Sequence, residues 1–177
     1  MIDQGPGWTA AKKRSEAFLD HAHHEIIVNR PDSKFCAVNL TLKQGMHDGS
    51  VCEKLTRDIV SNCIKLLMRN LDKCVFKNGY TRKNNMLVRV PAIEMSIRDR
   101  LHVHMLLEIP DRIPFDEFNK LIELKWAQNI WSGKQLKIDY IENKSEELRF
   151  TKYFSKDAWM GDDVIDIENV YLGQSVH

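Results

Sequence analysis

The segment MLVRVPAIEMSIRDRLHVHMLLEI, residues 86–109, decides the fold of this chain. Residues 86–95 and 101–109 have the apolar, alternating composition of two strands, and a short turn at 97–99 joins them. Strands that follow each other through so short a turn pair antiparallel. The sheet is therefore expected to be at least partly antiparallel.

The flanking sequence alternates amphipathic helices with further strands. Apolar residues recur at helical spacing in several segments, and residues that favour helix starts (Thr9, Ser50, Pro114, Ser145) stand at their beginnings. The predicted helices cover 10–27, 50–70, 114–126 and 145–156, the further strands cover 34–43 and 135–142, and a loop covers 77–85. The expected fold class is α+β, with helices on one face of the sheet and the other face free for a site.

Composition indicates one ordinary globular domain. The chain has 177 residues, of which 43% are hydrophobic and 29% charged, and this is enough apolar content for a sizeable core. We expect a single domain over 1–177, with a core at about 34–157, an N-terminal helix at 9–28 and an acidic C-terminal tail at 158–177.

The cell compartment is inferred from what the sequence lacks. No apolar run approaches the roughly 18 residues of a membrane span, and the first residues do not follow the order of a signal peptide. Four cysteines without a Cys-x-x-Cys pair (Cys36, Cys52, Cys63, Cys74) are predicted to be reduced core thiols of a cytoplasmic protein. The net charge of +1 does not favour a dedicated nucleic-acid binder, although local basic clusters leave phosphate binding open.

Two histidines on the second strand of the hairpin are the first sign of chemistry. Side chains two apart on a strand share a face, so His102 and His104 point the same way while Val103 points into the core. Two imidazoles at this spacing can converge on one divalent metal ion. The alternative is a pair of partly buried, hydrogen-bonded histidines without a ligand.

The hairpin geometry adds a carboxylate to this pair. With the turn centred near Arg98, Glu94 lies opposite His102 and shares its face. Two imidazole nitrogens and one carboxylate oxygen suit Mg²⁺ or Mn²⁺ that must also hold a phosphate oxygen, and zinc stays open as an alternative. Asp99 is a second, less well anchored candidate ligand, whereas Glu108 is expected to lie too far along the strand.

A second histidine group serves as an internal comparison. His21, His23 and His24 have similar spacing but fall in a helical pattern, where residues two apart point in nearly opposite directions. We expect this group to be exposed or to cap the helix. Spacing alone therefore does not indicate a metal site.

The late predicted helix supplies a candidate nucleophile. Tyr153 and Lys156 are three residues apart and share a helical face. A nearby ammonium favours the phenolate and neutralises charge on a phosphate in the transition state. The alternative is a structural role, in which the ring of Tyr153 packs against the sheet edge.

Together these segments resemble the HUH endonucleases. HVH at 102–104 is similar to their histidine motif, YFSKD at 153–157 to their single-tyrosine nicking motif, and VNLTL at 38–42 to the first-strand motif of rolling-circle replication initiators (Rep). Glu94 stands where many viral Rep proteins have a third metal ligand. The order of the motifs, histidines before tyrosine, is that of Rep proteins and single-tyrosine transposases.

The resemblance implies a fold, a reaction and partners. The fold would be a central antiparallel sheet of about five strands with flanking helices, derived from the ferredoxin-like arrangement. Tyr153 would attack single-stranded DNA at a replication origin and leave a 5′-phosphotyrosine link, with Lys156 assisting and Glu94, His102 and His104 holding Mg²⁺ or Mn²⁺. Leu40 and Thr41 would shape the sheet and the DNA groove.

Several alternatives stay open at this point. The sequence has no P-loop, which leaves a separate helicase as a partner, and the chain is either a domain of a longer initiator or a small stand-alone Rep. Its location would be nuclear if the source were a eukaryotic virus. A single-tyrosine transposase is one alternative function. Another is a non-catalytic nucleic-acid-binding module, which would need exposed aromatic residues on the central strands.

Overall fold

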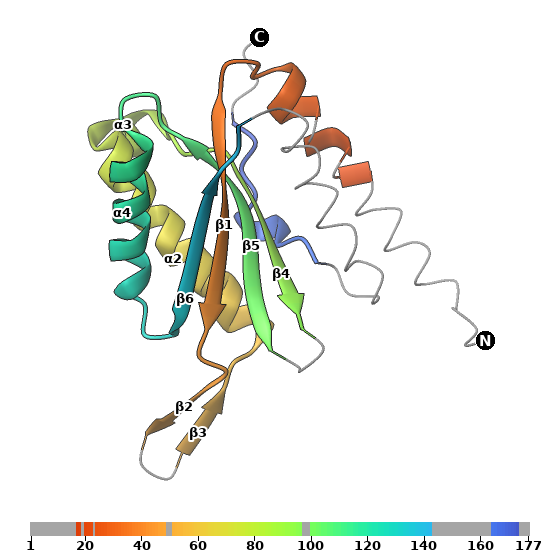
Figure 1. Cartoon of the computed structure of the whole chain (residues 1–177), viewed down its shortest axis with the longest axis vertical. Helices are drawn as coiled ribbons and strands as arrows, with labels where there is room; N and C mark the ends of the chain where they lie inside the picture. The colour runs from red at the N-terminus through yellow and green to blue at the C-terminus, as the bar shows by residue number, and fades with distance from the viewer. Residues whose placement is uncertain are drawn as a thin grey trace, which may run out of the picture.

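Four strands form one antiparallel sheet in the computed structural model (Figure 1). Across the sheet these strands are β4 (Arg89–Met95), β5 (Leu101–Ile109), β1 (Lys34–Leu42) and β6 (Ser132–Tyr140). The structure describes residues 17–18, 20–22, 24–48, 51–96, 100–142 and 164–173. The α+β class is confirmed, although the sheet has four strands in this part of the chain where about five were expected.

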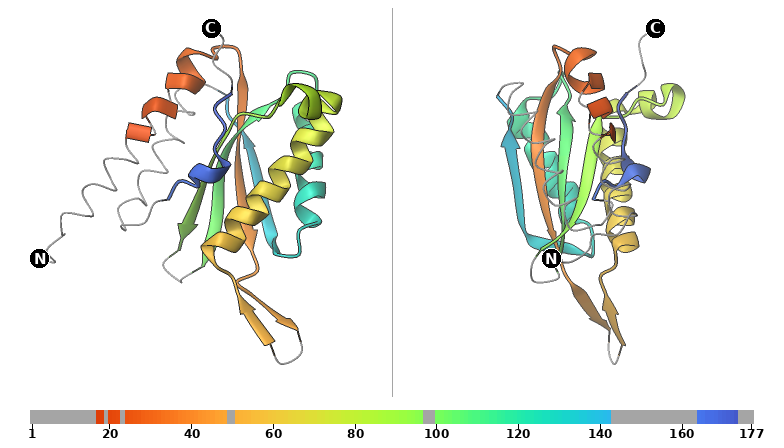
Figure 2. Two further views of the ribbon diagram at one scale, coloured as in Figure 1. Left: turned by 180° about the vertical axis from the view of Figure 1, so that it is seen from behind. Right: turned by 90° about the vertical axis from the view of Figure 1, so that its right-hand side faces the viewer.

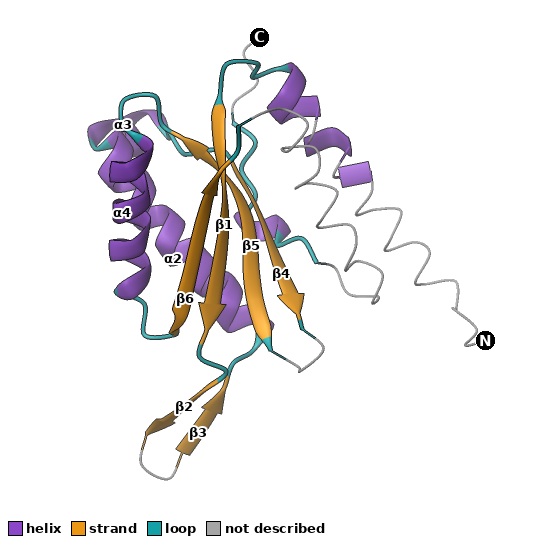
Figure 3. Cartoon of the chain, viewed as in Figure 1, coloured by secondary structure: helices purple, strands orange, loops and turns teal. Residues whose placement is uncertain are grey.

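Two long helices cover one face of the sheet (Figure 3). They are α2 (Arg57–Phe76) and α4 (Phe115–Ala127), and α4 begins at the residue after Pro114, as predicted. Alternate residues of the strands point toward these helices, including the fully buried Val38, Val103 and Met105. This burial of apolar side chains provides the main core. No helix in the described ranges has both the length and the apolar character that crossing a bilayer requires.

The segment predicted to begin a helix at Ser50 instead contains a hairpin. Strands β2 (Gly45–Asp48) and β3 (Val51–Lys54) pair with each other and project beyond the sheet (Figure 1). Helix α2 begins only after Thr56, whose side-chain oxygen accepts a hydrogen bond from the Ile59 N–H at 3.3 Å. Residues 57–70 of the predicted helix are helical, but its predicted start was wrong. The spacing of Val51, Leu55 and Ile59 matches one helical stripe, yet these residues belong to a strand, a connection and a helix start.

Smaller differences concern the ends of elements. The predicted loop at 77–85 contains the short helix α3 (Asn78–Lys83), which is separated from α2 by Lys77 with a φ of 49° and ends at Asn84 with a φ of 51°. Strand β4 starts three residues later than predicted because the Leu87 N–H donates to Asp72 instead of to a neighbouring strand. Strand β6 starts three residues earlier than predicted and ends two residues earlier.

The other face of the sheet is partly covered by the two ends of the described chain (Figure 2). Residues 17–18 and 20–22 are helical and lead into the π-helix η1 (His24–Val28), which places the buried Ala22 and Ile26 against the sheet. Residues 164–173, here called the strap, contain the short helix η3 (Ile167–Asn169). Ala22, Ile26, Val164 and Ile165 form a second core with Phe35, Ala37, Val90 and Leu106.

The strap lies along the outer edge of β4. The Ile93 N–H donates to the Val164 carbonyl at 2.8 Å, and the Asp166 N–H donates to the Pro91 carbonyl at 3.0 Å. Asp166 is buried and accepts a hydrogen bond from Ser61 on α2 at 3.0 Å. The described part of the predicted acidic tail therefore packs against the sheet edge and α2.

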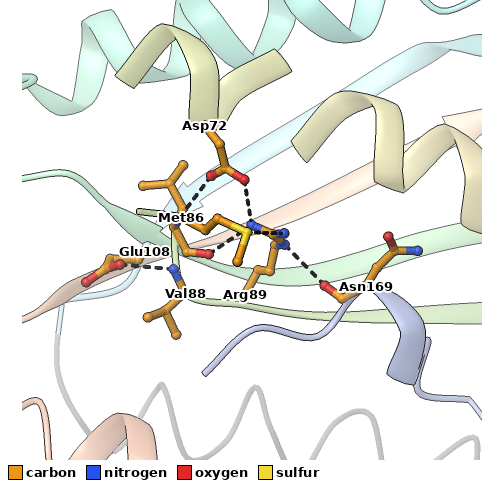
Figure 4. A network of polar contacts seen from close by, with 7 residues as sticks. Asp72, Met86, Val88, Arg89, Glu108 and Asn169 are labelled. Atoms are coloured by element: carbon orange, nitrogen blue, oxygen red, sulfur yellow. Dashed lines mark hydrogen bonds and ion pairs between the residues drawn. The ribbon is translucent and has the colours of Figure 1, made fainter. Parts of the chain in front are cut away.

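A buried ion pair joins α2 to β4 and the strap (Figure 4). Nη1 of Arg89 lies 2.9 Å from Oδ2 of Asp72, and Nε of Arg89 donates to the Asn169 carbonyl at 3.2 Å. The Leu87 N–H donates to the other Asp72 oxygen at 2.9 Å. Burial raises the pKa of Asp72, while the guanidinium of Arg89 and the Leu87 N–H act in the opposite direction.

Candidate metal centre

Three neighbouring strands contribute polar side chains to one spot on the sheet face opposite α2 and α4. Glu94 on β4 lies directly opposite His102 on β5, which confirms the register predicted from the turn. His104 lies opposite Asn39 on β1, and His102 lies opposite Thr41. Because directly opposed residues project from the same face, all five side chains lie on one surface.

One carboxylate oxygen of Glu94 lies between the two imidazoles. Oε2 is 3.3 Å from Nε2 of His102 and 3.2 Å from Nε2 of His104. Glu94 is only 2% exposed, whereas the side chains of His102 and His104 are 27% and 15% exposed. The two rings meet edge to face, with centroids 4.9 Å apart. The three groups thus form a half-buried cluster whose open side is the side of the histidines.

The other nitrogen of each imidazole contacts an oxygen. Nδ1 of His104 contacts Oδ1 of Asn39, and Nδ1 of His102 lies 3.3 Å from the Arg100 carbonyl. Both oxygens can only accept, so these contacts are hydrogen bonds in the tautomer that carries its proton on Nδ1. In a neutral imidazole of this tautomer, Nε2 carries the lone pair, and in both residues it faces Glu94. Histidines that ligate metals are commonly held in this way by an acceptor on the second ring nitrogen.

Electrostatics favours a positive charge between Glu94, His102 and His104. Two nitrogen lone pairs and a carboxylate oxygen at 3.2–3.3 Å repel one another, unless an imidazole is protonated or a cation lies between them. Ligand atoms about 2.1 Å from a metal are separated by about 3.0 Å in an octahedron and about 3.4 Å in a tetrahedron. The distances between Glu94 and the histidines fall between these values. The residues present therefore fit a divalent ion with open coordination positions, and among the described residues they are the group of three whose ligand atoms lie within 4.8 Å of one another.

The surroundings of the cluster differ between its two sides. Toward β4, Glu94 is buried and the strap pairs with the adjacent Ile93. Toward β6, the half-buried Asn39 lies opposite Lys137, whose side chain is 73% exposed. Lys137 shares the face of Asn39 and His104 and forms an ion pair with Asp139 at 2.7 Å. Within the described part of the chain, an approaching ligand thus meets the cluster from the side of β1 and β6.

The structure brings together three of the residues predicted for the site. Glu94, His102 and His104 converge as described, whereas Tyr153, Lys156 and the second candidate ligand Asp99 lie outside the described residues. Glu108 is separate from the cluster, as predicted. Its carboxylate accepts from the Val88 N–H at 3.0 Å and from Ser33 at 3.2 Å and lies 3.7 Å from Arg30.

Two further predictions concern the helical histidine group and the cysteines. His21 and His24 are exposed, in agreement with the expectation, and His23 is outside the described side chains. Cys36 and Cys63 are buried, but Cys52 and Cys74 are exposed, so the prediction of four core thiols was wrong for two of them. Burial raises the pKa of Cys36 to about 12, which makes this thiol inert as a nucleophile or ligand.

Asn39 is a residue of the candidate site that the sequence did not reveal. The first-strand motif contains Asn39, but the motif predicts no role for the asparagine itself. The available signal was its polarity within the apolar run of β1, on a strand whose partner was then unknown. Only the pairing of β1 with β5 places it beside His104.

The chain was compared with known proteins at the level of sequence and of structure. No protein-family model, no curated protein and no solved structure matches it.

Proposed function

We propose that this chain is a metal-dependent nicking enzyme of the HUH class, a Rep-like protein that cleaves and rejoins single-stranded DNA. The observation that carries the proposal is the convergence of Glu94, His102 and His104, with both Nε2 atoms facing one carboxylate oxygen. The cluster lies on the face of an antiparallel sheet opposite to α2 and α4, an arrangement that is compatible with the proposal.

Glu94, His102 and His104 would hold Mg²⁺ or Mn²⁺. The bound ion would supply positive charge that polarises the scissile phosphate. Asn39 holds the His104 ring through Nδ1, and the Arg100 carbonyl does the same for His102. These contacts fix the ring orientations before a ligand arrives, and such preorganisation is what a phosphate-binding centre requires.

Tyr153 is the proposed nucleophile, on the strength of its motif. Its Oη would form a bond to phosphorus while the bond from phosphorus to the 3′ oxygen breaks. The phenolic proton would leave Tyr153, and the departing 3′ oxygen would take up a proton, with Lys156 assisting one of these transfers. Attack of a 3′-hydroxyl on the phosphotyrosine would reverse the step and rejoin the strand.

Lys137 is the proposed first contact for the DNA backbone. Its ammonium group lies on the same row of the sheet as Asn39 and His104, on the open side of the cluster. A phosphate that bridges Lys137 and the cluster would lie across β1. Asp139 competes with this phosphate for the same ammonium group.

The competing interpretation as a non-catalytic nucleic-acid module is less well supported. Such a module needs aromatic rings exposed on its central strands. Phe35 is the aromatic residue of β1, β5 has none, and Phe35 is fully buried in the second core.

The test is formation of a covalent adduct with DNA. Wild-type protein is incubated with a random pool of single-stranded oligonucleotides and Mn²⁺, and the products are separated on a denaturing gel. We expect an adduct that depends on Mn²⁺ and disappears in Tyr153→Phe, while DNA binding by that variant persists. An adduct that survives in Tyr153→Phe would show that another residue is the nucleophile, and an equal yield in chelator would exclude a role for the metal.

The proposed contact between Lys137 and the DNA backbone can be tested by substitution. Lys137→Gln should weaken binding of single-stranded DNA and reduce the salt dependence of binding by about one phosphate contact. Asp139→Asn should strengthen binding, because it removes a competing carboxylate. Lys120→Gln on α4, which changes charge equally on the opposite side of the sheet, is the control. Equal effects of the Lys137 and Lys120 variants would show that only net charge matters.

A further inference from the structure

A cavity lies at the end of the sheet remote from the metal cluster. It has a volume of about 610 Å³ and is lined by the end of α2, by α3 and by the turn that follows β5. In Figure 1, α3 lies at the end of the sheet opposite to the β2–β3 hairpin. Strand β5 carries His102 near its start and Ile109 at its end, a separation of about 20 Å. The cavity is therefore a separate site, and its volume is in the range of small-molecule sites.

The floor of the cavity is apolar. Leu87 and Ile109 are buried members of the main core, and Phe76 and Ile113 are partly buried residues that pack against it. The exposed faces of these partly buried side chains, a phenyl ring among them, form a surface that suits a flat apolar group. Asn78 and Asn85 also line the cavity, and their side-chain amides offer both donors and acceptors.

Three cationic side chains surround this floor. Arg82 and Lys83 come from the last turn of α3, and Arg112 comes from the turn after β5. None of the three has a carboxylate within 4.0 Å among the residues that the structure describes. Two carboxylates, Glu108 and Asp111, also line the cavity. Glu108 already contacts the Val88 N–H, Ser33 and Arg30, so Asp111 is the carboxylate that offsets the three cations. The balance of charge favours an anion.

We propose that this cavity binds a nucleotide. The phosphate would bind to the guanidinium groups of Arg82 and Arg112, with Lys83 adding charge, because arginine binds phosphate oxygens in a bidentate fashion. The base would lie on the ring of Phe76, with its polar edge toward Asn78 and Asn85. A free nucleotide and one nucleotide unit of a DNA strand both offer this phosphate and base.

Calorimetric titration of the full chain tests this site. Adenosine monophosphate should bind more tightly than adenosine or inorganic phosphate, because it alone engages both the cations and the floor. Arg82→Gln/Arg112→Gln should weaken its binding at least tenfold. Lys65→Gln/Lys120→Gln removes the same charge from exposed positions on α2 and α4 and should leave binding unchanged. Phe76→Leu should weaken binding of the nucleotide but not of phosphate.

A second titration with a ten-residue oligodeoxyadenylate distinguishes the two sources. If binding of both the oligonucleotide and the monophosphate depends on the two arginines, the site takes a free nucleotide. If only binding of the oligonucleotide depends on them, the site takes one nucleotide unit of a strand. Absence of binding for both, or equal affinity for phosphate and adenosine monophosphate, would overturn the proposal. Tyr153→Phe, which removes the proposed nucleophile, should bind adenosine monophosphate as tightly as the wild type does, so failure of this site and failure of the nicking function are separable.

Discussion

Asn39 orients one histidine of the candidate metal site. It is not a ligand in the proposed site, yet its Oδ1 accepts from Nδ1 of His104 and so directs Nε2 toward Glu94. Asn39→Ala should therefore weaken Mn²⁺ binding about 10- to 100-fold, measured by titration calorimetry. Asn39→Asp keeps an acceptor at the same place and should restore most of the affinity. If the alanine variant bound Mn²⁺ as tightly as the wild type, the orienting role would be wrong.

Arg89 neutralises the carboxylate of Asp72, whose charged form burial would otherwise disfavour. Loss of one partner from a buried ion pair costs about 3–5 kcal/mol, so Arg89→Gln should lower the free energy of unfolding by roughly that amount at pH 7. Urea denaturation measures this change. Asp72→Asn/Arg89→Gln removes both charges and should recover part of the loss.

The ion pair of Asp72 and Arg89 should also make the free energy of unfolding depend on pH. The pKa of Asp72 is raised by burial above its ordinary value of 3.8, so the native state binds this proton more tightly than the unfolded chain does. The contribution of Asp72 to stability therefore falls as pH rises from 3.8 through the raised pKa. Without Arg89 this pKa rises further. The defect of Arg89→Gln should thus be smaller at acidic pH, where Asp72 is protonated, and equal defects at both pH values would contradict this account.

At the scale of elements, an irregular pairing joins β1 to β6. The register shifts between Leu40 and Leu42, and Thr41 uses its side chain to donate to the Gln135 carbonyl and to accept from the Gln135 N–H. Gly133 lies against this bulge, where an added Cβ would come within 2.6 Å of the Thr41 carbonyl oxygen. This contact is with backbone and cannot be relieved by a side-chain rotation.

Gly133→Ala should therefore destabilise the protein by about 1–3 kcal/mol. Gly45→Ala is a matched control in the β2–β3 hairpin, because its added Cβ would lie 3.5 Å from the nearest atom, an ordinary contact. Thermal unfolding of the two variants gives the comparison. Similar midpoints for both would mean that the bulge adapts without strain.

The elements also show how far sequence reasoning reaches. Alternation and a short turn were sufficient for the hairpin of β4 and β5, and symmetry about the turn was sufficient to pair Glu94 with His102. The β2–β3 hairpin was not predicted, since its apolar spacing imitates a helix. Asn39 and the strap depend on pairings between segments that lie far apart in the chain, and local periodicity carries no information about such pairings.

At the scale of the whole molecule, the strap ties the sheet edge to α2. Asn169 donates to the Ser61 carbonyl and hydroxyl at 3.0 and 2.9 Å and to Asp166 at 2.7 Å. Asn169→Ala would remove the donor to these oxygens, one of them Oδ2 of the buried Asp166, so it should lower the free energy of unfolding by about 1–3 kcal/mol. Ile167→Ser changes an exposed neighbour (63% exposed) and should be nearly neutral. If hydrogen exchange of the Ile93 amide were unchanged in Asn169→Ala, the strap would not depend on this residue.

The strap also has a consequence for how copies of this protein meet in solution. A bare edge strand offers unpaired backbone groups to any other strand and so promotes self-association. On β4 these groups are already taken by residues 164–171, and Pro91 has no N–H to offer. On the opposite edge, β6 presents exposed lysines at positions 134 and 137, which disfavour the approach of a second strand. Each edge of the sheet thus has its own protection against fibre-like growth, and a chain that lost the strap would be expected to self-associate through β4.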